Sequence, residues 1–226
     1  MAATPLLPGR ALAQAGVSAQ PRHGVHASLL TAQQRALTWF VGDATPHTVA
    51  FTIRPAEGTP GQERAFAAIS TATPTYGTPL FTHRVVLDGV APGQALRYRI
   101  ARDGAWVQEG ELPAFPSGKL RFCHFADHAQ SMASQAVVAG VLERRPDLAI
   151  IAGDLAYANG DQALWDSYFA MLEPLAAAIP VLSCPGNHER HDGSGQGYLS
   201  RITQPGRGAW YALDLERVHF FFGTAG

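Results

Sequence analysis

The feature that most constrains the fold is a change in the hydrophobic period near the middle of the chain. From residue 24 to about residue 116, apolar residues recur at every second position between clusters of Gly, Pro and Asp. In the segment around Leu96, Tyr98 and Ile100, arginines fill the positions between, as in a strand with one buried face. About seven such short strands predict an all-β sandwich of immunoglobulin-like type.

After a Pro- and Gly-containing stretch at residues 112–119, the pattern alternates between short apolar runs and longer segments with helical spacing. This order predicts a parallel sheet whose strands are joined by right-handed helical crossovers. We expect strands at 120–126, 148–152 and 180–184, helices at 129–142 and 161–178, and two further strands at 210–215 and 218–222.

The composition narrows the class of partners. With 17 Lys and Arg against 18 Asp and Glu the net charge is −1, which gives no field to hold a polyanion, so we predict no nucleic-acid partner. No run of about 18 apolar residues occurs, so no transmembrane helix is predicted. The two cysteines, Cys123 and Cys184, are too few for a disulfide framework. We expect buried free thiols, although the sequence does not exclude a bond between them.

Polar side chains follow each of the three predicted parallel strands. Asp127 comes after the first strand, Asp154 and Tyr157 after the second, and Asn187 and His188 after the third. Because ligands of open α/β sheets bind at the carboxyl ends of the strands, we expect these three loops to meet in one crevice.

The residue types in these loops indicate a metal site. Carboxylate, phenol, amide and imidazole groups suit Fe, Mn, Mg or Zn better than soft copper. We expect Asp154, on the middle strand in sequence, to bridge two ions about 3.5–4 Å apart, a spacing typical of hydrolytic sites in which bound water becomes hydroxide. Asn187 offers a neutral oxygen to one ion. We expect His188 to protonate a departing alkoxide or to hold phosphoryl oxygens.

The order Asp127, Gly-Asp154-x-x-Tyr157, Gly-Asn187-His188-Glu189 resembles the calcineurin-like metallophosphoesterases and, more closely, the purple acid phosphatases. The first part, with residues 82–93 and 98–100, is similar to the fibronectin-III-like domain of plant-type members. The resemblance implies a β-sandwich followed by an incomplete αββα metallophosphoesterase sandwich. We expect a disordered tail or export-signal remnant at 1–20, and domains at 21–117 and 118–226.

The resemblance also implies a role for each of these residues. Asp127 and Tyr157 would bind the first metal, and the Tyr157 phenolate would give a visible colour with ferric iron. Asp154 would bridge both metals, and Asn187 would bind the second. The cofactors would be Fe(III) and a divalent Fe, Zn or Mn ion. The implied reaction is hydrolysis of small phosphate monoesters by metal-bound hydroxide, with His188 acting on the leaving group.

The family's Val-x-x-His and Gly-His-x-His motifs, which supply three histidine ligands, do not occur among the 226 residues. We therefore expect a fragment that binds metal poorly and turns over slowly. Two alternatives stay open: a phosphodiesterase of the same superfamily, and a non-catalytic binding or cell-surface module. Residues 11–15 are similar to the end of an export signal, so we expect a secreted or periplasmic protein. The sequence makes no prediction of oligomeric state.

Overall fold

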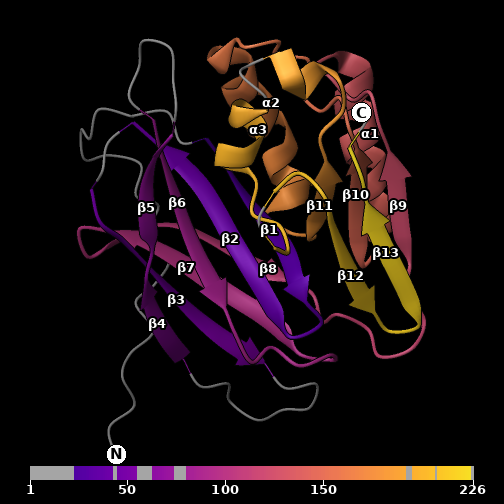
Figure 1. Ribbon diagram of the computed structural model, residues 1–226. Helices are drawn as coiled ribbons and strands as arrows, with labels where there is room; N and C mark the ends of the chain where they lie inside the picture. Colours follow the sequence, from indigo (N-terminus) through magenta and orange to yellow (C-terminus); the bar gives the residue numbers. More distant parts are fainter. Residues whose placement is uncertain are drawn as a thin grey trace, which may run out of the picture.

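The computed structural model describes residues 23–42, 45–54, 63–73, 80–191, 195–206 and 208–224, so the tail expected at 1–20 lies outside it. The described part of the first segment holds eight strands, where about seven are predicted. They pair antiparallel in two four-stranded sheets, ordered β1-β2-β6-β5 and β4-β3-β7-β8 (Figure 1). Their bounds are β1 His23–Thr31, β2 Gln34–Val41, β3 His47–Arg54, β4 Glu63–Ala67, β5 Ile69–Thr73, β6 Leu80–Leu87, β7 Ala95–Arg102 and β8 Ala105–Leu112.

The two sheets enclose a common apolar core. Trp39 and Val85 come from one sheet, Phe51 and Tyr98 from the other, and all four are buried in the same cluster. The alternation of apolar and polar residues that predicts β7 explains this core, because every second side chain of a strand points to the same face. An all-β first part is therefore present, as the period of two indicates.

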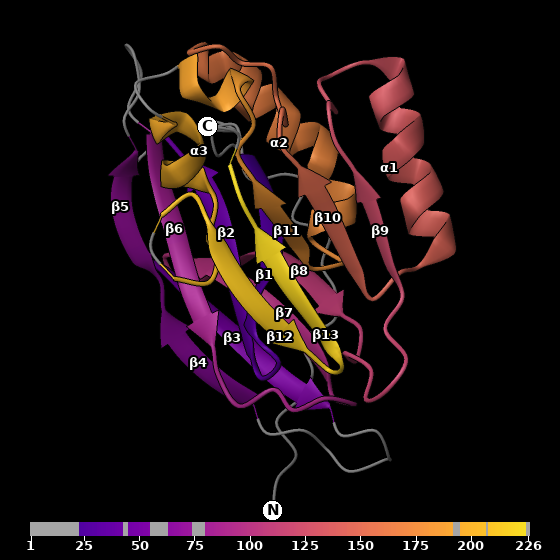
Figure 2. The same ribbon diagram turned by 45° about the vertical axis from the view of Figure 1, so that its right-hand side comes forward.

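The second segment contains the predicted parallel sheet, ordered β11-β10-β9. The helices α1 and α2 pack on one face of this sheet, and the hairpin β12–β13 packs on the other (Figure 2). Two short helices, η1 and α3, lie between β11 and β12. The bounds are β9 Phe122–Phe125, α1 Met132–Arg144, β10 Leu148–Ala152, α2 Gln162–Ala176, β11 Val181–Cys184, η1 His188–His191, α3 Gln196–Arg201, β12 Tyr211–Leu215 and β13 Val218–Phe222.

Local capping sets where the two long helices begin. The Ser131 side chain accepts a hydrogen bond from Ser134 N at 3.1 Å, and that of Asp161 accepts one from Ala163 N at 2.9 Å. Ser and Asp are favoured at this position because they satisfy a backbone N–H that has no partner within the helix. Helix α1 therefore starts three residues later than the predicted position 129.

The sandwich and the parallel-sheet segment share apolar clusters. Phe40 of β2 packs against Phe169 of α2, with ring centroids 5.0 Å apart, within the cluster that also holds the helices of the second segment. The Tyr98 hydroxyl donates to the carbonyl oxygen of Ala177, just after α2, at 3.0 Å. Helix α2 is thus covered by the sandwich on one side and by the parallel sheet on the other. None of the described helices is both long and apolar enough to cross a membrane.

Cys123 and Cys184 are half-buried free thiols. They lie on β9 and β11, the two strands that flank β10. Burial is the main reason that the pKa of each thiol lies above its ordinary value. The expectation of free thiols is confirmed, and that of full burial is met only in part.

Candidate functional site

We call the loops after β9, β10 and β11 the first, second and third loops. The first and second loops remain hydrogen-bonded to each other beyond the ends of their strands. The amide of Asp127 donates to the carbonyl oxygen of Gly153 at 3.3 Å, and that of Ala129 donates to Leu155 at 2.8 Å. The parallel pairing thus extends into both loops, because consecutive backbone groups stay in register. This fixes the position of Asp127 relative to the loop that carries Asp154 and Tyr157.

Tyr157 contacts Asp127 directly. Its hydroxyl donates to Asp127 Oδ1 at 2.7 Å. This hydrogen bond to a carboxylate is the main reason that the pKa of Tyr157 is raised to about 12, and the charge of Asp154 contributes in the same direction. The hydroxyl proton is thus shared with an oxygen that would otherwise be free to bind a cation.

Asp154 connects this pair to the third loop. Its Oδ1 accepts a hydrogen bond from the backbone N–H of His188 at 3.1 Å, and the rings of Tyr157 and His188 lie 4.3 Å apart between centroids. Asn187 immediately precedes His188, is exposed, and accepts Arg190 N at its carbonyl oxygen at 3.2 Å. The structure thus brings Asp127, Asp154, Tyr157 and His188 together through direct contacts. It places Asn187 beside them in the chain.

The backbone of the first two loops is unusual. Five residues in these loops have φ between 49° and 53°, out of eight non-glycine residues with positive φ in the described part of the chain. This left-handed conformation costs an L-residue roughly 1–2 kcal/mol. Asp and Asn tolerate it, whereas an aromatic residue rarely adopts it. The five are Asp127, Ala129, Asp154, Tyr157 and Asn159. Such strain is typical of functional sites, where the surrounding structure holds it in place.

Two glycines allow the second and third loops to touch. A Cβ on Gly186 would overlap Asp154 Oδ1 and would lie 2.6 Å from the Asp154 amide nitrogen. A Cβ on Gly153 would lie 2.9 Å from Gly186 Cα. The glycine of each Gly-Asp and Gly-Asn pair is therefore needed for close backbone approach.

Glu189 is a buried residue of the site to which sequence reasoning assigns no role. Its side chain is 2% exposed, and its carboxylate accepts the amides of Asp154 and Gly186, both at 2.8 Å, and of Leu155 at 2.9 Å. Burial raises the pKa of Glu189, while the three N–H donors act in the opposite direction. The only sequence signal is a carboxylate one position after the His188 of the motif.

Two further side chains contact His188. Asn159 Oδ1 lies 2.7 Å from His188 Nδ1 and 2.9 Å from His191 Nδ1. By contrast, His128, which follows Asp127, is buried beside α1 and contacts Ser134 O at 3.1 Å. Of the histidines near these loops, His188 and His191 therefore share one acceptor, and His128 belongs to the packing of α1.

The donor set fits hard metal ions. Carboxylate oxygens of Asp127 and Asp154, the phenol of Tyr157 and the amide oxygen of Asn187 are ligands that suit Fe, Mn, Mg or Zn. Within the described ranges, no group of three or more His, Cys, Asp or Glu residues is arranged to hold a metal. The fit therefore rests on mixed oxygen donors, two of which, on Tyr157 and Asp127, lie 2.7 Å apart.

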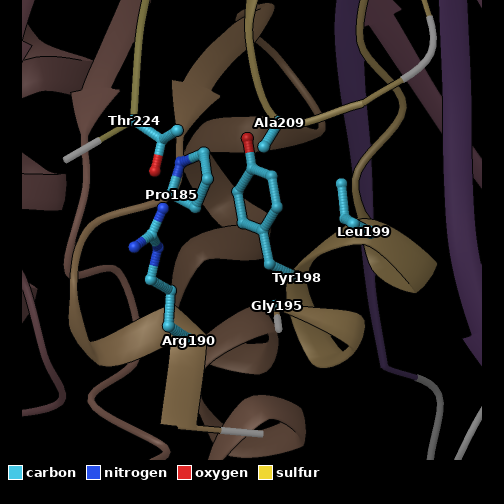
Figure 3. Close-up of a pocket in the computed structure, with 7 residues that line it drawn as sticks. All are labelled: Pro185, Arg190, Gly195, Tyr198, Leu199, Ala209 and Thr224. Atoms are coloured by element: carbon cyan, nitrogen blue, oxygen red, sulfur yellow. The ribbon is translucent and has the colours of Figure 1, made fainter. Parts of the chain in front are cut away.

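A cavity of about 350 Å³ lies beside the third loop. In Figure 3 the Arg190 side chain extends from η1 toward Pro185 and Thr224, and the Tyr198 ring forms another wall. Its described lining residues are Pro185, Arg190, Gly195, Tyr198, Leu199, Ala209 and Thr224. No sequence pattern predicts this cavity, because its walls come from four separate segments.

Comparison with known families agrees with this arrangement. Residues 120–223, which contain all three loops, match the model of the calcineurin-like phosphoesterases. These residues form a calcineurin-like metallophosphoesterase domain. This phosphoesterase domain is homologous to the purple acid phosphatases, and that family implies a centre of two metal ions.

Two curated relatives of the phosphoesterase domain are acid phosphatases. The chain is 31% identical over 150 residues to acid phosphatase type 7 of Mus musculus, and 32% identical over 151 residues to that of Homo sapiens. Each alignment covers 62% of this chain and 34% of the relative. The chain thus spans about a third of the length of these relatives.

A solved structure shares the fold. The purple acid phosphatase PPD1 from yellow lupin (Lupinus luteus) seeds superposes with a TM-score of 0.77 at 20% identity, over 89% of this chain and 44% of that chain. Because the superposition covers most of the chain, the arrangement of the β-sandwich before the phosphoesterase domain is shared as well. At this identity the likeness concerns the fold alone.

Proposed function

We propose that this chain is part of a phosphatase that hydrolyses small phosphate monoesters at a centre of two metal ions. The observation that carries the proposal is the 2.7 Å contact between the Tyr157 hydroxyl and Asp127 Oδ1. The exposed Tyr157 phenol and the Asp127 carboxylate together offer a trivalent cation two anionic oxygens. The neighbouring Asp154 carboxylate offers an oxygen that a second ion can share. Few structural roles require a tyrosine in a strained conformation at that position.

Each residue then has a distinct task. Asp127 and Tyr157 would hold the first ion, Fe(III), and Asn187 would hold the second, a divalent Fe, Zn or Mn ion. Asp154 would be shared by both ions, since it lies between Tyr157 and the loop that carries Asn187. Such a pair of ions supplies a nucleophile derived from water and stabilises the oxygens of the transferred phosphoryl group. His188 protonates the departing alkoxide.

The proposal includes the surroundings of this site. Residues 21–117 form a fibronectin-III-like accessory domain, and residues 118–226 belong to the catalytic domain. The contacts of the sandwich with α2 support a fixed position of the accessory domain beside that helix. We place the protein in the secreted or periplasmic compartment, where its substrate is a small phosphate ester and water accepts the phosphoryl group.

Reconstitution with Fe(III) and Zn(II) tests the function. In a polypeptide that joins these residues to the family's Val-x-x-His and Gly-His-x-His motifs, we expect two metals per chain, a visible band from the phenolate, and hydrolysis of p-nitrophenyl phosphate. Tyr157→Phe removes the band, and Asp154→Ala removes both metals. Asp103→Ala is the matched control, because Asp103 has φ of 50° and is 73% exposed in the β7–β8 turn.

Three results would contradict the proposal. Two metals retained in Asp154→Ala would exclude the bridging role. Faster hydrolysis of bis-p-nitrophenyl phosphate than of the monoester would favour a phosphodiesterase. Absence of both metal and turnover in every polypeptide that includes these residues would favour a binding module.

A further inference from the structure

The single turn of η1 directs its side chains in three different directions. A 3₁₀-helix has three residues per turn, so residues i and i+3 lie on the same face. His188 and His191 therefore share a face, whereas Glu189 is buried against the second loop and Arg190 lines the cavity. The His188 and His191 rings lie 5.3 Å apart between centroids.

The orientation of the Asn159 side-chain amide is fixed by the backbone of Tyr157, two residues before it. Its Nδ2 donates to the carbonyl oxygen of Tyr157 at 3.3 Å. Because a carbonyl oxygen only accepts hydrogen bonds, the amide nitrogen must face Tyr157, and Oδ1 must face the two imidazoles. Asn159 Oδ1 likewise only accepts, so Nδ1 of both His188 and His191 must carry a hydrogen.

We propose that Asn159 is a positioning residue that holds His188 and His191 with Nδ1 protonated, and that His191 contacts the substrate phosphoryl group beside His188. The proposal rests on the proposed function, because it assigns the substrate contact to the same site. With Nδ1 bound to Asn159, only Nε2 of each ring is left for the substrate. His191 Nε2 accepts from a P–OH group or, when protonated, donates to a phosphoryl oxygen.

The same arrangement suits proton transfer from His188. When the alkoxide departs, the Nε2–H bond of the imidazolium breaks and an O–H bond forms on the alkoxide oxygen. The electron pair of the N–H bond stays on Nε2. The Nδ1–H bond to Asn159 is present before and after this step, so the ring keeps its orientation.

A purely structural role does not account for these contacts. The buried Glu189 carboxylate already joins η1 to the second loop through two hydrogen bonds, from the amides of Asp154 and Leu155. Asn159 and His191 are both exposed, where a hydrogen bond that replaces one to water contributes little net stability. Two imidazoles oriented at the surface of a phosphoesterase loop are better explained by contact with a ligand.

Nitrogen-15 NMR of the imidazoles tests the positioning role without any measurement of activity. The spectra are recorded near pH 8.5, about two pH units above the ordinary histidine pKa. Long-range ¹H–¹⁵N correlations should identify His188 and His191 as Nδ1–H tautomers, assigned through His188→Gln and His191→Gln. His128 is the internal control with the opposite tautomer, since its Nε2 faces the Ser134 carbonyl oxygen at 3.1 Å. An Nε2–H tautomer at either His188 or His191 would overturn the assignment.

Two variants separate the acceptor from the fold. Asn159→Asp keeps an oxygen acceptor and should keep both tautomers. Asn159→Gly removes the acceptor but still accommodates the φ of 49°, and should return both rings to a mixture of tautomers. Unchanged tautomers in Asn159→Gly would show that Asn159 does not position the rings.

Inorganic phosphate, added to the polypeptide with both family histidine motifs and loaded with diamagnetic Zn(II), tests the contact. We expect the Nε2 signals of both His188 and His191 to shift, while that of His128 stays in place. His191→Gln should weaken phosphate binding about tenfold, by the loss of one charge-assisted hydrogen bond. A shift of His188 alone would exclude His191 as a contact and leave the proposed function intact. A shift of neither ring would count against the proposed function itself, whereas the tautomer result is independent of it.

Discussion

The Glu189 carboxylate accepts a hydrogen bond from the backbone N–H of Asp154 at 2.8 Å, across 35 positions of the sequence. The same carboxylate accepts the amides of Leu155 and Gly186. One buried negative charge thus satisfies three N–H groups where the second and third loops meet. The position of the candidate bridging residue depends on a side chain that does not itself face the site.

Replacement of Glu189 by Gln should destabilise the protein by about 2–4 kcal/mol. The amide of Gln offers one acceptor oxygen, and its NH₂ group would face an N–H donor, which leaves buried groups unpaired. Urea denaturation measures the change in the free energy of unfolding. Glu109→Gln is the control, because Glu109 is 63% exposed in a surface ion pair, and it should cost less than about 1 kcal/mol. Equal losses in the two variants would mean that Glu189 does not hold the loops.

Gly186→Ala should displace Asp154 and reduce stability. The new Cβ would overlap Asp154 Oδ1 and the Asp154 amide, which belongs to a backbone held on both sides. Gly140→Ala is the matched control in helix α1. Its Cβ would meet only the flexible end of Arg144, at 3.3 Å, and should add about 0.5–1 kcal/mol of stability. Thermal unfolding of both variants should therefore shift in opposite directions, and a neutral Gly186→Ala would contradict the close approach.

Asp127→Asn should lower the pKa of Tyr157 from about 12 toward its ordinary value near 10. The carboxylate that accepts the Tyr157 hydrogen bond favours the protonated phenol, and a neutral amide does so less. Ultraviolet difference absorbance follows the titration of tyrosine.

The other described tyrosines are buried, and burial raises their pKa values. They should titrate after Tyr157, and Tyr157→Phe identifies its step. A step that stays in place in Asp127→Asn would show that Asp127 does not control the phenol.

Acid should destabilise the fold through His26. This ring stacks on Phe169 at 4.9 Å and lies 3.1 Å from the carbonyl oxygens of Gly24 and Arg201. Burial lowers the pKa of His26 to about 4, from 6.5 in an unfolded chain. Between these values the unfolded chain binds a proton that the folded chain does not. The contribution of neutral His26 to the free energy of unfolding is therefore complete above pH 6.5. As the pH falls toward 4, this contribution of about 3 kcal/mol is lost.

The free energy of unfolding, measured at several pH values, checks the role of His26. His26→Gln should flatten the dependence between pH 6.5 and 4. His219→Gln is the matched control, since the His219 side chain is 63% exposed. If both variants kept the full slope, the acid sensitivity would belong to other groups.

The sequence predicts the strands and helices of the second segment well, because their apolar periods are long and unbroken. The strands at 148–152 and 218–222 have the bounds expected. The face of α1 is harder to predict. Met132 and Val137 are 86% and 39% exposed, whereas Ser134 is buried. Alanines and glycine leave the hydrophobicity of α1 nearly equal around its axis, so packing against α2 and the sheet decides which face is buried.

The sequence by itself determined which residues follow each parallel strand, because a buried strand must end in a polar loop. Asp127, Asp154, Tyr157, Asn187 and His188 are found in this way. Only the tertiary structure decided that Glu189 binds the amides of a distant loop and that one Asn159 oxygen serves both His188 and His191. These contacts depend on strand register and on backbone dihedrals. Neither leaves a periodic trace in the sequence, since each involves single residues about 30 positions apart.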